Sequence, residues 1–87
     1  MKILFQVYIL QNQQGGRYIG ISSNVERRVE AHNKGLSSYT RNRGPWELKW
    51  ISNQMTHNEA LLLEKLLKQQ KGGNGLKSLL SIHQQGS

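Results

Sequence analysis

Apolar residues are concentrated near the start of the chain, where residues 3–10 combine Ile, Leu, Phe, Val and Tyr and predict a β-strand. The glycine pair at 15–16 predicts a turn, and residues 17–21 predict a returning antiparallel strand. Apolar and polar residues alternate over 46–50, which predicts a third strand with one buried face. These segments together predict a three-stranded antiparallel sheet.

Three helices are expected between and after these strands. The first runs over about residues 24–34. Its N-cap candidates are Ser22, Ser23 and Asn24, and Ser23 and Glu26 fit the spacing of a capping box. The second, over about 58–71, is the most strongly indicated because it carries five leucines, and a short third helix is expected over about 75–83. The order β-β-α-β-α-α predicts a small α+β fold in which helices flank the sheet.

Size and charge narrow the possible functions. The 87 residues suit one domain, expected over residues 1–83 with a disordered tail over 84–87. Twelve Lys and Arg oppose five Glu and no Asp, and the net charge of +7 predicts a polyanionic partner, most commonly nucleic acid. The chain has no Cys, no signal sequence and no apolar run of membrane-spanning length, which favours a cytoplasmic protein without a membrane partner.

Two tyrosines and two basic residues form the first part of a candidate site. Tyr8 and Tyr18 lie on the two strands of the predicted hairpin, which can bring their hydroxyls to one face. Arg28 and His32 are four residues apart on a predicted helix and therefore share a face. A guanidinium can stabilise the charge of a phosphoryl transition state, and an imidazole can bind the phosphate or orient a tyrosine. Singly, each tyrosine is better explained as an ordinary sheet aromatic.

Glu64 is a candidate metal ligand in the leucine-rich helix. A carboxylate among apolar neighbours needs a partner, and a divalent ion is one such partner. Mg²⁺ keeps most of its water and often takes only one or two carboxylates plus a substrate phosphate, so one Glu suffices for one Mg²⁺ or Mn²⁺ ion. The alternative is an exposed Glu64 that pairs with Lys68 at i+4.

Four segments in this order resemble the motifs of the GIY-YIG nuclease family: Val-Tyr-Ile at 7–9, Tyr-Ile-Gly at 18–20, Arg-Val-Glu-Ala-His at 28–32 and Ala-Leu-Leu-Leu-Glu at 60–64. The resemblance covers residues 5–71 and is closest to the short stand-alone bacterial members. It implies a tyrosine that orients or deprotonates the attacking water, and a metal ion on the glutamate. The implied catalytic residues are Tyr8, Tyr18, Arg28, His32 and Glu64. Tyr8 is favoured as the base, with the reverse order open.

Two positions depart from the family pattern. Gln6 stands where the first motif has a glycine, and Ile21 follows the second motif where some members carry a lysine that could assist the base. Without that lysine, activation of a tyrosine has to come from the metal ion and from Arg28 or His32.

The resemblance implies a metal-dependent endonuclease acting on DNA, with structured or damaged DNA in repair or recombination as candidate substrates. The alternative is a nucleic-acid-binding module of the same fold with little or no turnover, and a third hypothesis is a protein-interaction domain of the same descent. Residues on or near the motif-bearing elements would contact phosphates, and one aromatic residue would stack on a base. These residues are Arg17, Arg27, Lys34, Tyr39, Arg41, Arg43 and Lys65.

Overall fold

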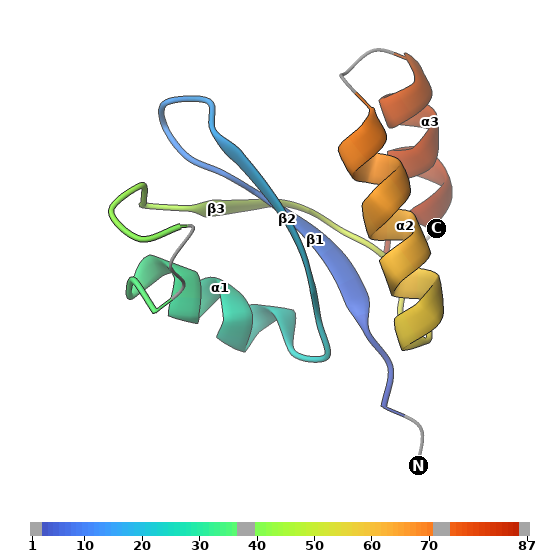
Figure 1. Cartoon of the computed structure of the whole chain (residues 1–87), viewed down its shortest axis with the longest axis horizontal. Helices are drawn as coiled ribbons and strands as arrows, with labels where there is room; N and C mark the ends of the chain where they lie inside the picture. The colour runs from blue at the N-terminus through green and yellow to red at the C-terminus, as the bar shows by residue number, and fades with distance from the viewer. Residues whose placement is uncertain (1–2, 37–39, 71–73, 86–87) are drawn as a thin grey trace.

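The computed structural model describes residues 3–36, 40–70 and 74–85, and Figure 1 shows the arrangement of its elements. A three-stranded antiparallel sheet lies between one helix and a pair of helices, which confirms the predicted α+β class and the order β-β-α-β-α-α. The elements are β1 (Gln6–Gln11), β2 (Arg17–Ser22), α1 (Val25–Asn33), β3 (Glu47–Ile51), α2 (His57–Gln69) and α3 (Asn74–His83).

β1 is the central strand of the sheet, in the order β2-β1-β3. In its pairing with β2, Tyr8 lies opposite Gly20 and Leu10 lies opposite Tyr18. Directly opposed residues of an antiparallel pair point to the same face of the sheet, so both tyrosines lie on one face. β1 begins at Gln6, later than the sequence predicted, because Phe5 makes only an isolated bridge to the chain beyond β3.

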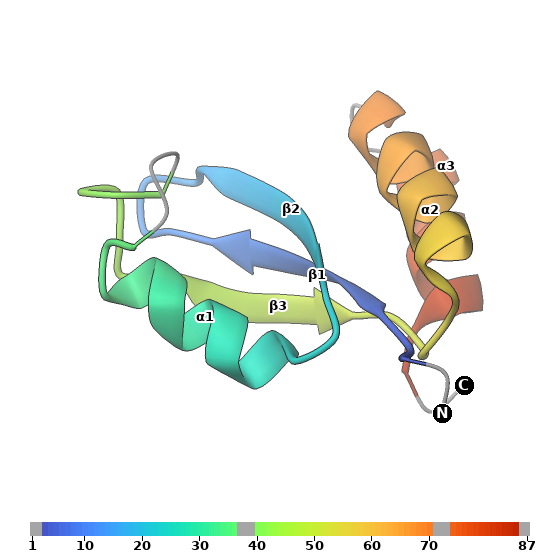
Figure 2. The same cartoon turned by 60° about the horizontal axis from the view of Figure 1, so that its bottom comes forward.

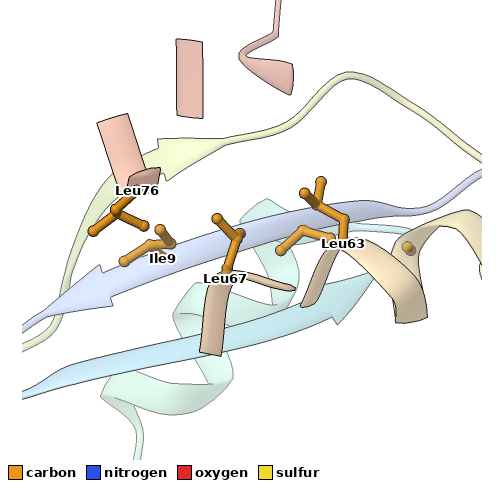
Figure 3. Close-up of a cluster of buried hydrophobic side chains, with 6 residues drawn as sticks. Ile9, Leu63, Leu67 and Leu76 are labelled. Carbon is orange, nitrogen blue, oxygen red and sulfur yellow. The ribbon is translucent and has the colours of Figure 1, made fainter. Parts of the chain in front are cut away.

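Alternate residues of β1 face two separate hydrophobic clusters. Tyr8 and Leu10 pack in the cluster on the α1 face, while Val7 and Ile9 pack in the cluster formed with α2 and α3. α2 and α3 lie side by side, and α1 lies on the other side of the sheet (Figures 1 and 2). Figure 3 shows that the second cluster joins three elements, because Ile9 of β1, Leu63 and Leu67 of α2, and Leu76 of α3 converge.

The helix starts show which capping predictions hold. The predicted capping box of α2 is confirmed, since the hydroxyl of Thr56 accepts from the N–H of Glu59 and the Glu59 carboxylate accepts from the N–H of Thr56. The predicted box at α1 is wrong. Asn24 is the N-cap, and its side-chain oxygen accepts from the N–H of Arg27 at 3.1 Å.

Residues 84 and 85 are hydrogen-bonded at the end of β3. The backbone N–H of Gln85 donates to the carbonyl of Ile51 at 3.0 Å, and Gln84 forms an isolated bridge with Ser52. Backbone hydrogen bonds therefore hold the first two residues of the expected tail against the sheet. Among the helices in the described ranges, none has both the length and the apolar character that crossing a membrane requires.

Candidate active site

Gly20 creates the space in which the two tyrosines meet. A Cβ at this position would lie 2.5 Å from the Tyr8 hydroxyl and 2.9 Å from Cε2 of Tyr18, closer than a real Cβ approaches other atoms. The rings of Tyr8 and Tyr18 are diagonal neighbours on the sheet, and their centroids are 6.2 Å apart. The glycine of the second motif therefore lets the Tyr8 side chain cross β2 and reach Tyr18.

His32 connects the tyrosines to α1. Its Nε2 lies 2.8 Å from the hydroxyl of Tyr8, and its ring centroid lies 4.7 Å from that of Tyr18. Its other nitrogen, Nδ1, lies 2.8 Å from the hydroxyl of Thr40 in the loop that follows α1. Both ring nitrogens therefore have a polar partner inside the protein, as a buried imidazole requires.

Burial and the charge of Arg28 set the protonation of these groups. Burial, with a smaller effect of Tyr18, raises the pKa of Tyr8 to about 12, although the neighbouring Arg28 guanidinium acts in the opposite direction. Burial also lowers the pKa of His32 below its ordinary value, and Arg28 lowers it further. At neutral pH the structure therefore holds a protonated phenol against a neutral imidazole, whose facing nitrogen accepts or donates according to the tautomer.

Arg28 is exposed on α1, one helical turn before His32. The charge of its guanidinium acts on both the Tyr8 hydroxyl and His32, so it lies beside the pair while it remains open to solvent. An exposed guanidinium next to a hydrogen-bonded tyrosine–histidine pair is suited to bind a phosphate at that point. Arg27 is also exposed, and its backbone N–H donates to the side chain of Asn24, the N-cap of α1.

Glu64 lies on α2, between the leucines that pack against the sheet. Its side chain is 22% exposed, and its carboxylate lies 3.4 Å from the ammonium of Lys68 at i+4. The pairing anticipated as an alternative is therefore present. Lys68 and Tyr18 both line a groove of about 470 Å³ between β2 and α2, so this groove extends from Tyr18 to the ion-pair partner of Glu64. The lining residues are Arg17, Tyr18, Ile19, Leu67, Lys68 and Gln70.

The donor set at Glu64 restricts the kind of metal site that fits. Across residues 3–36, 40–70 and 74–85, no group of three or more His, Cys, Asp or Glu side chains is placed to hold a metal ion. A half-buried single carboxylate fits a hard divalent ion whose other ligands are water and substrate phosphate. Glu64 is therefore compatible with one hard divalent ion that takes a single carboxylate from the protein.

The residues predicted to bind nucleic acid are spread over several elements. Arg17 lines the groove, while Arg27 and Lys65 are exposed on α1 and α2. Lys34 forms an ion pair with Glu30 at 2.8 Å. The side chain of Arg41 donates to the carbonyl of Gly35 at 3.1 Å, and Arg43 is exposed. Tyr39 lies outside the described residues.

Sequence reasoning missed Thr40, which is buried against His32. Thr40 follows His32 by eight residues and lies in a loop, so neither helical periodicity nor strand alternation connects the two. The sequence feature that could have indicated Thr40 is His32, because a buried imidazole needs a hydrogen-bond partner on each nitrogen. Reasoning from that requirement would have directed attention to the hydroxyls of the following loop.

The fold is a small α+β domain, and comparison with known proteins defines its class. A model of the GIY-YIG catalytic domain matches residues 4–77. The chain is 36% identical to a UPF0213 protein of Oceanobacillus iheyensis over 64 residues, which are 72% of this chain and 74% of that protein. It is 37% identical to a UPF0213 protein of Clostridium perfringens over 70 residues, which are 75% of each chain. No solved structure matches the chain significantly.

The chain belongs to the GIY-YIG family, and its relatives include UPF0213 proteins of bacteria. A further such protein, from Nitratidesulfovibrio vulgaris, is 34% identical over 77 residues, which are 87% of this chain and 70% of that protein. The GIY-YIG family is a nuclease family, its substrate is nucleic acid, and its nucleases are generally dependent on a divalent metal ion. The family resemblance seen in the sequence is thereby confirmed.

Proposed function

We propose that this protein is a metal-dependent endonuclease that hydrolyses phosphodiester bonds in DNA. One observation carries the proposal: the Tyr8 hydroxyl lies 2.8 Å from Nε2 of a histidine whose pKa is lowered. An exposed arginine lies beside this pair, and the groove next to Tyr18 extends to the ion-pair partner of Glu64. Nucleophilic attack on a phosphate needs a proton acceptor, a cation at the phosphate and support for the leaving oxygen.

Tyr8 and His32 would act together on the attacking water. Burial keeps the Tyr8 phenol protonated, so it accepts a proton from water only as its own proton moves to Nε2 of His32. Tyr8 is fully buried, with Tyr18 and Arg28 interacting with its hydroxyl. A substrate phosphate that binds the guanidinium of Arg28 would draw that group away from Tyr8 and open the hydroxyl to water.

Arg28 and Tyr18 would hold the phosphate while the bond to the leaving oxygen breaks. The planar guanidinium of Arg28 matches two phosphate oxygens and stabilises the charge that develops on them in the transition state. Tyr18 lines the groove and is half-buried, so its hydroxyl is the one that can contact the phosphate. Glu64 would hold the divalent ion in place of its contact with Lys68, and the ion supplies Lewis-acid stabilisation to the leaving oxygen.

The test compares each proposed site residue with another residue of the same charge elsewhere on the protein. Arg28→Ala should lower Mg²⁺-dependent cleavage of plasmid and branched DNA by about 100-fold or more, whereas Arg27→Ala should stay within about threefold of the wild type. Glu64→Gln should abolish the response to Mg²⁺ and Mn²⁺, while Glu26→Gln, on the first turn of α1, should keep it. Cleavage that survives both Arg28→Ala and Glu64→Gln would come from a contaminant and would contradict the proposal.

A binding module with little turnover is the second candidate, and the net charge of +7 supports it. Such a module would bind DNA in a salt-dependent manner in the presence of Mg²⁺ without cutting any member of a substrate panel. The panel should contain linear, branched, mismatched and abasic duplexes, because repair and recombination substrates are the candidates. Retention of DNA binding together with no cleavage of this panel would favour the binding module.

A further inference from the structure

Thr40 lies at one end of a buried chain of three polar side chains. The Tyr8 hydroxyl is 2.8 Å from Nε2 of His32, and Nδ1 of His32 is 2.8 Å from the Thr40 hydroxyl. These residues retain 0%, 1% and 1% of their accessible surface, respectively. Water has little access to the contacts, so the partners themselves decide where each proton lies.

The chemistry of the two hydroxyls indicates the direction of these hydrogen bonds. A neutral imidazole carries one N–H and one lone pair, so one neighbour must donate to the ring and the other must accept from it. A phenol, with an ordinary pKa of about 10, is a stronger donor than an aliphatic hydroxyl. The lone pair is therefore best placed at Nε2, facing Tyr8, and the N–H at Nδ1, facing the oxygen of Thr40.

We propose that Thr40 is a positioning residue that holds His32 as the Nδ1–H tautomer and so keeps Nε2 free to receive the proton of Tyr8. Its catalytic consequence rests on the proposed nuclease function, although the tautomer itself does not. When Tyr8 takes a proton from water, its own proton passes to Nε2 and His32 becomes an imidazolium. Thr40 then accepts from Nδ1–H, so both N–H groups of the cation remain hydrogen-bonded.

The segment over residues 40–46 is fixed to the same helix as His32. The carbonyl of Thr40 accepts from the indole N–H of Trp46 at 3.1 Å and from the backbone N–H of Arg43 at 3.2 Å. The backbone of Trp46 makes two hydrogen bonds, of 2.6 and 3.1 Å, with the side chain of Asn33, the residue after His32. The hydroxyl of Thr40 is therefore held in a fixed place relative to the imidazole, as an orienting group must be.

The test compares Thr40→Val with Thr40→Ser. A hollow of about 410 Å³ adjoins both His32 and Thr40, so an alanine at this position would leave room for water to replace the hydroxyl, whereas valine fills the space. Serine keeps an oxygen that can accept from Nδ1. ¹⁵N NMR of the histidine side chains distinguishes the Nδ1–H and Nε2–H tautomers, and His32→Gln identifies the signals of His32 among those of the three histidines.

Wild type and Thr40→Ser should show the Nδ1–H tautomer at a pH of about 7.5, and Thr40→Val should show the Nε2–H tautomer. Cleavage should fall by roughly 10- to 100-fold in Thr40→Val and be largely retained in Thr40→Ser. Trp46→Phe is the structural control, because it removes the indole N–H from the Thr40 carbonyl and leaves the hydroxyl on His32. Its spectrum should show the wild-type tautomer.

Two results would overturn the proposal: an Nε2–H tautomer in the wild type, or an unchanged Nδ1–H tautomer in a folded Thr40→Val variant. If Thr40→Val fails to fold, the wild-type spectrum alone decides, since it must show Nδ1–H. The NMR readout requires no catalysis. A protein that cleaves no substrate but shows the expected tautomers would contradict the nuclease function and still support the role of Thr40.

Discussion

At the scale of single residues, the site depends on the absence of a side chain at Gly20 as much as on the side chains that surround it. Tyr8 is large and lies opposite Gly20, which has no Cβ to block the way to Tyr18. The role of this glycine is steric rather than conformational, because it is not among the residues with positive φ. Any larger residue at this position would have to displace the Tyr8 hydroxyl from His32, and the geometry of the proposed proton transfer would be lost.

Gly20→Ala should therefore lower DNA cleavage by about 100-fold, because the added Cβ, 2.5 Å from the Tyr8 hydroxyl, moves a reacting group by a large fraction of an ångström. Gly15→Ala is the matched control. Gly15 has a φ of +84° in the hairpin turn and nothing within 4 Å of an added Cβ, so alanine should cost about 1 kcal/mol of stability with cleavage unchanged. Cleavage assays and urea denaturation measure the two effects, and equal cleavage by both variants would argue against this role of Gly20.

At the scale of elements, α1 and α2 bring chemistry to the sheet from opposite faces. α1 carries Arg28 and His32 to the face of the two tyrosines, whereas α2 packs Leu63 and Leu67 on the other face and carries Glu64 beside them. The groove between β2 and α2 is the place where the two halves approach. The position of Glu64 therefore depends on how Leu63 and Leu67 pack α2 against the sheet.

The adjacent leucines of α2 test this dependence. Leu63 is 3% exposed in the core cluster, and Leu62 is 61% exposed. Leu63→Ala should lower the free energy of unfolding by about 2–5 kcal/mol, whereas Leu62→Ala should change it by less than about 0.5 kcal/mol. Urea denaturation followed by circular dichroism measures both. A similar small loss in the two variants would mean that α2 is not held to the sheet as described.

The element order could be predicted because each element follows from a local pattern. The proximity of Tyr8, Tyr18 and His32 followed from strand and helix spacing, whereas the catalytic roles of the five motif residues stay a prediction. The cap of α1 could not be predicted, since Ser22, Ser23 and Asn24 are all suitable N-caps and the choice depends on where β2 ends. Ser22 is still paired with Gln6, which leaves Asn24 at the first turn of the helix. Thr40 could not be predicted for a related reason: it lies eight residues from His32, and no periodic pattern links the two positions.

At the scale of the whole molecule, positively charged residues lie on both edge strands of the sheet and on the helices. Arg17 on β2 lines the groove, while Lys49 on β3, at the opposite edge, is paired with Glu47 at 2.9 Å. A net charge of +7 attracts DNA to the whole surface, but only residues that contact phosphates release counterions on binding. The salt dependence of DNA binding can therefore distinguish residues that contact phosphates in the groove from residues that only add to the net charge.

DNA binding measured without divalent ions should weaken linearly on a logarithmic salt axis. Arg17→Ala should reduce the magnitude of that slope by about 0.9, the loss expected for one phosphate contact. Lys49→Ala removes the same charge at the far edge and should leave the slope unchanged. Fluorescence anisotropy with a labelled duplex measures all three proteins, and an equal change in both variants would place the binding surface elsewhere.

The division of β1 between two clusters also determines how the site moves. Tyr8 lies between Val7 and Ile9, and those two residues are buried in the core cluster with α2 and α3. Local opening cannot free the tyrosine without breaking that core, because one stretch of backbone serves both faces. The tyrosine–histidine pair is therefore expected to be as rigid as the most protected part of the domain, and the motion that admits substrate falls to the exposed side chain of Arg28.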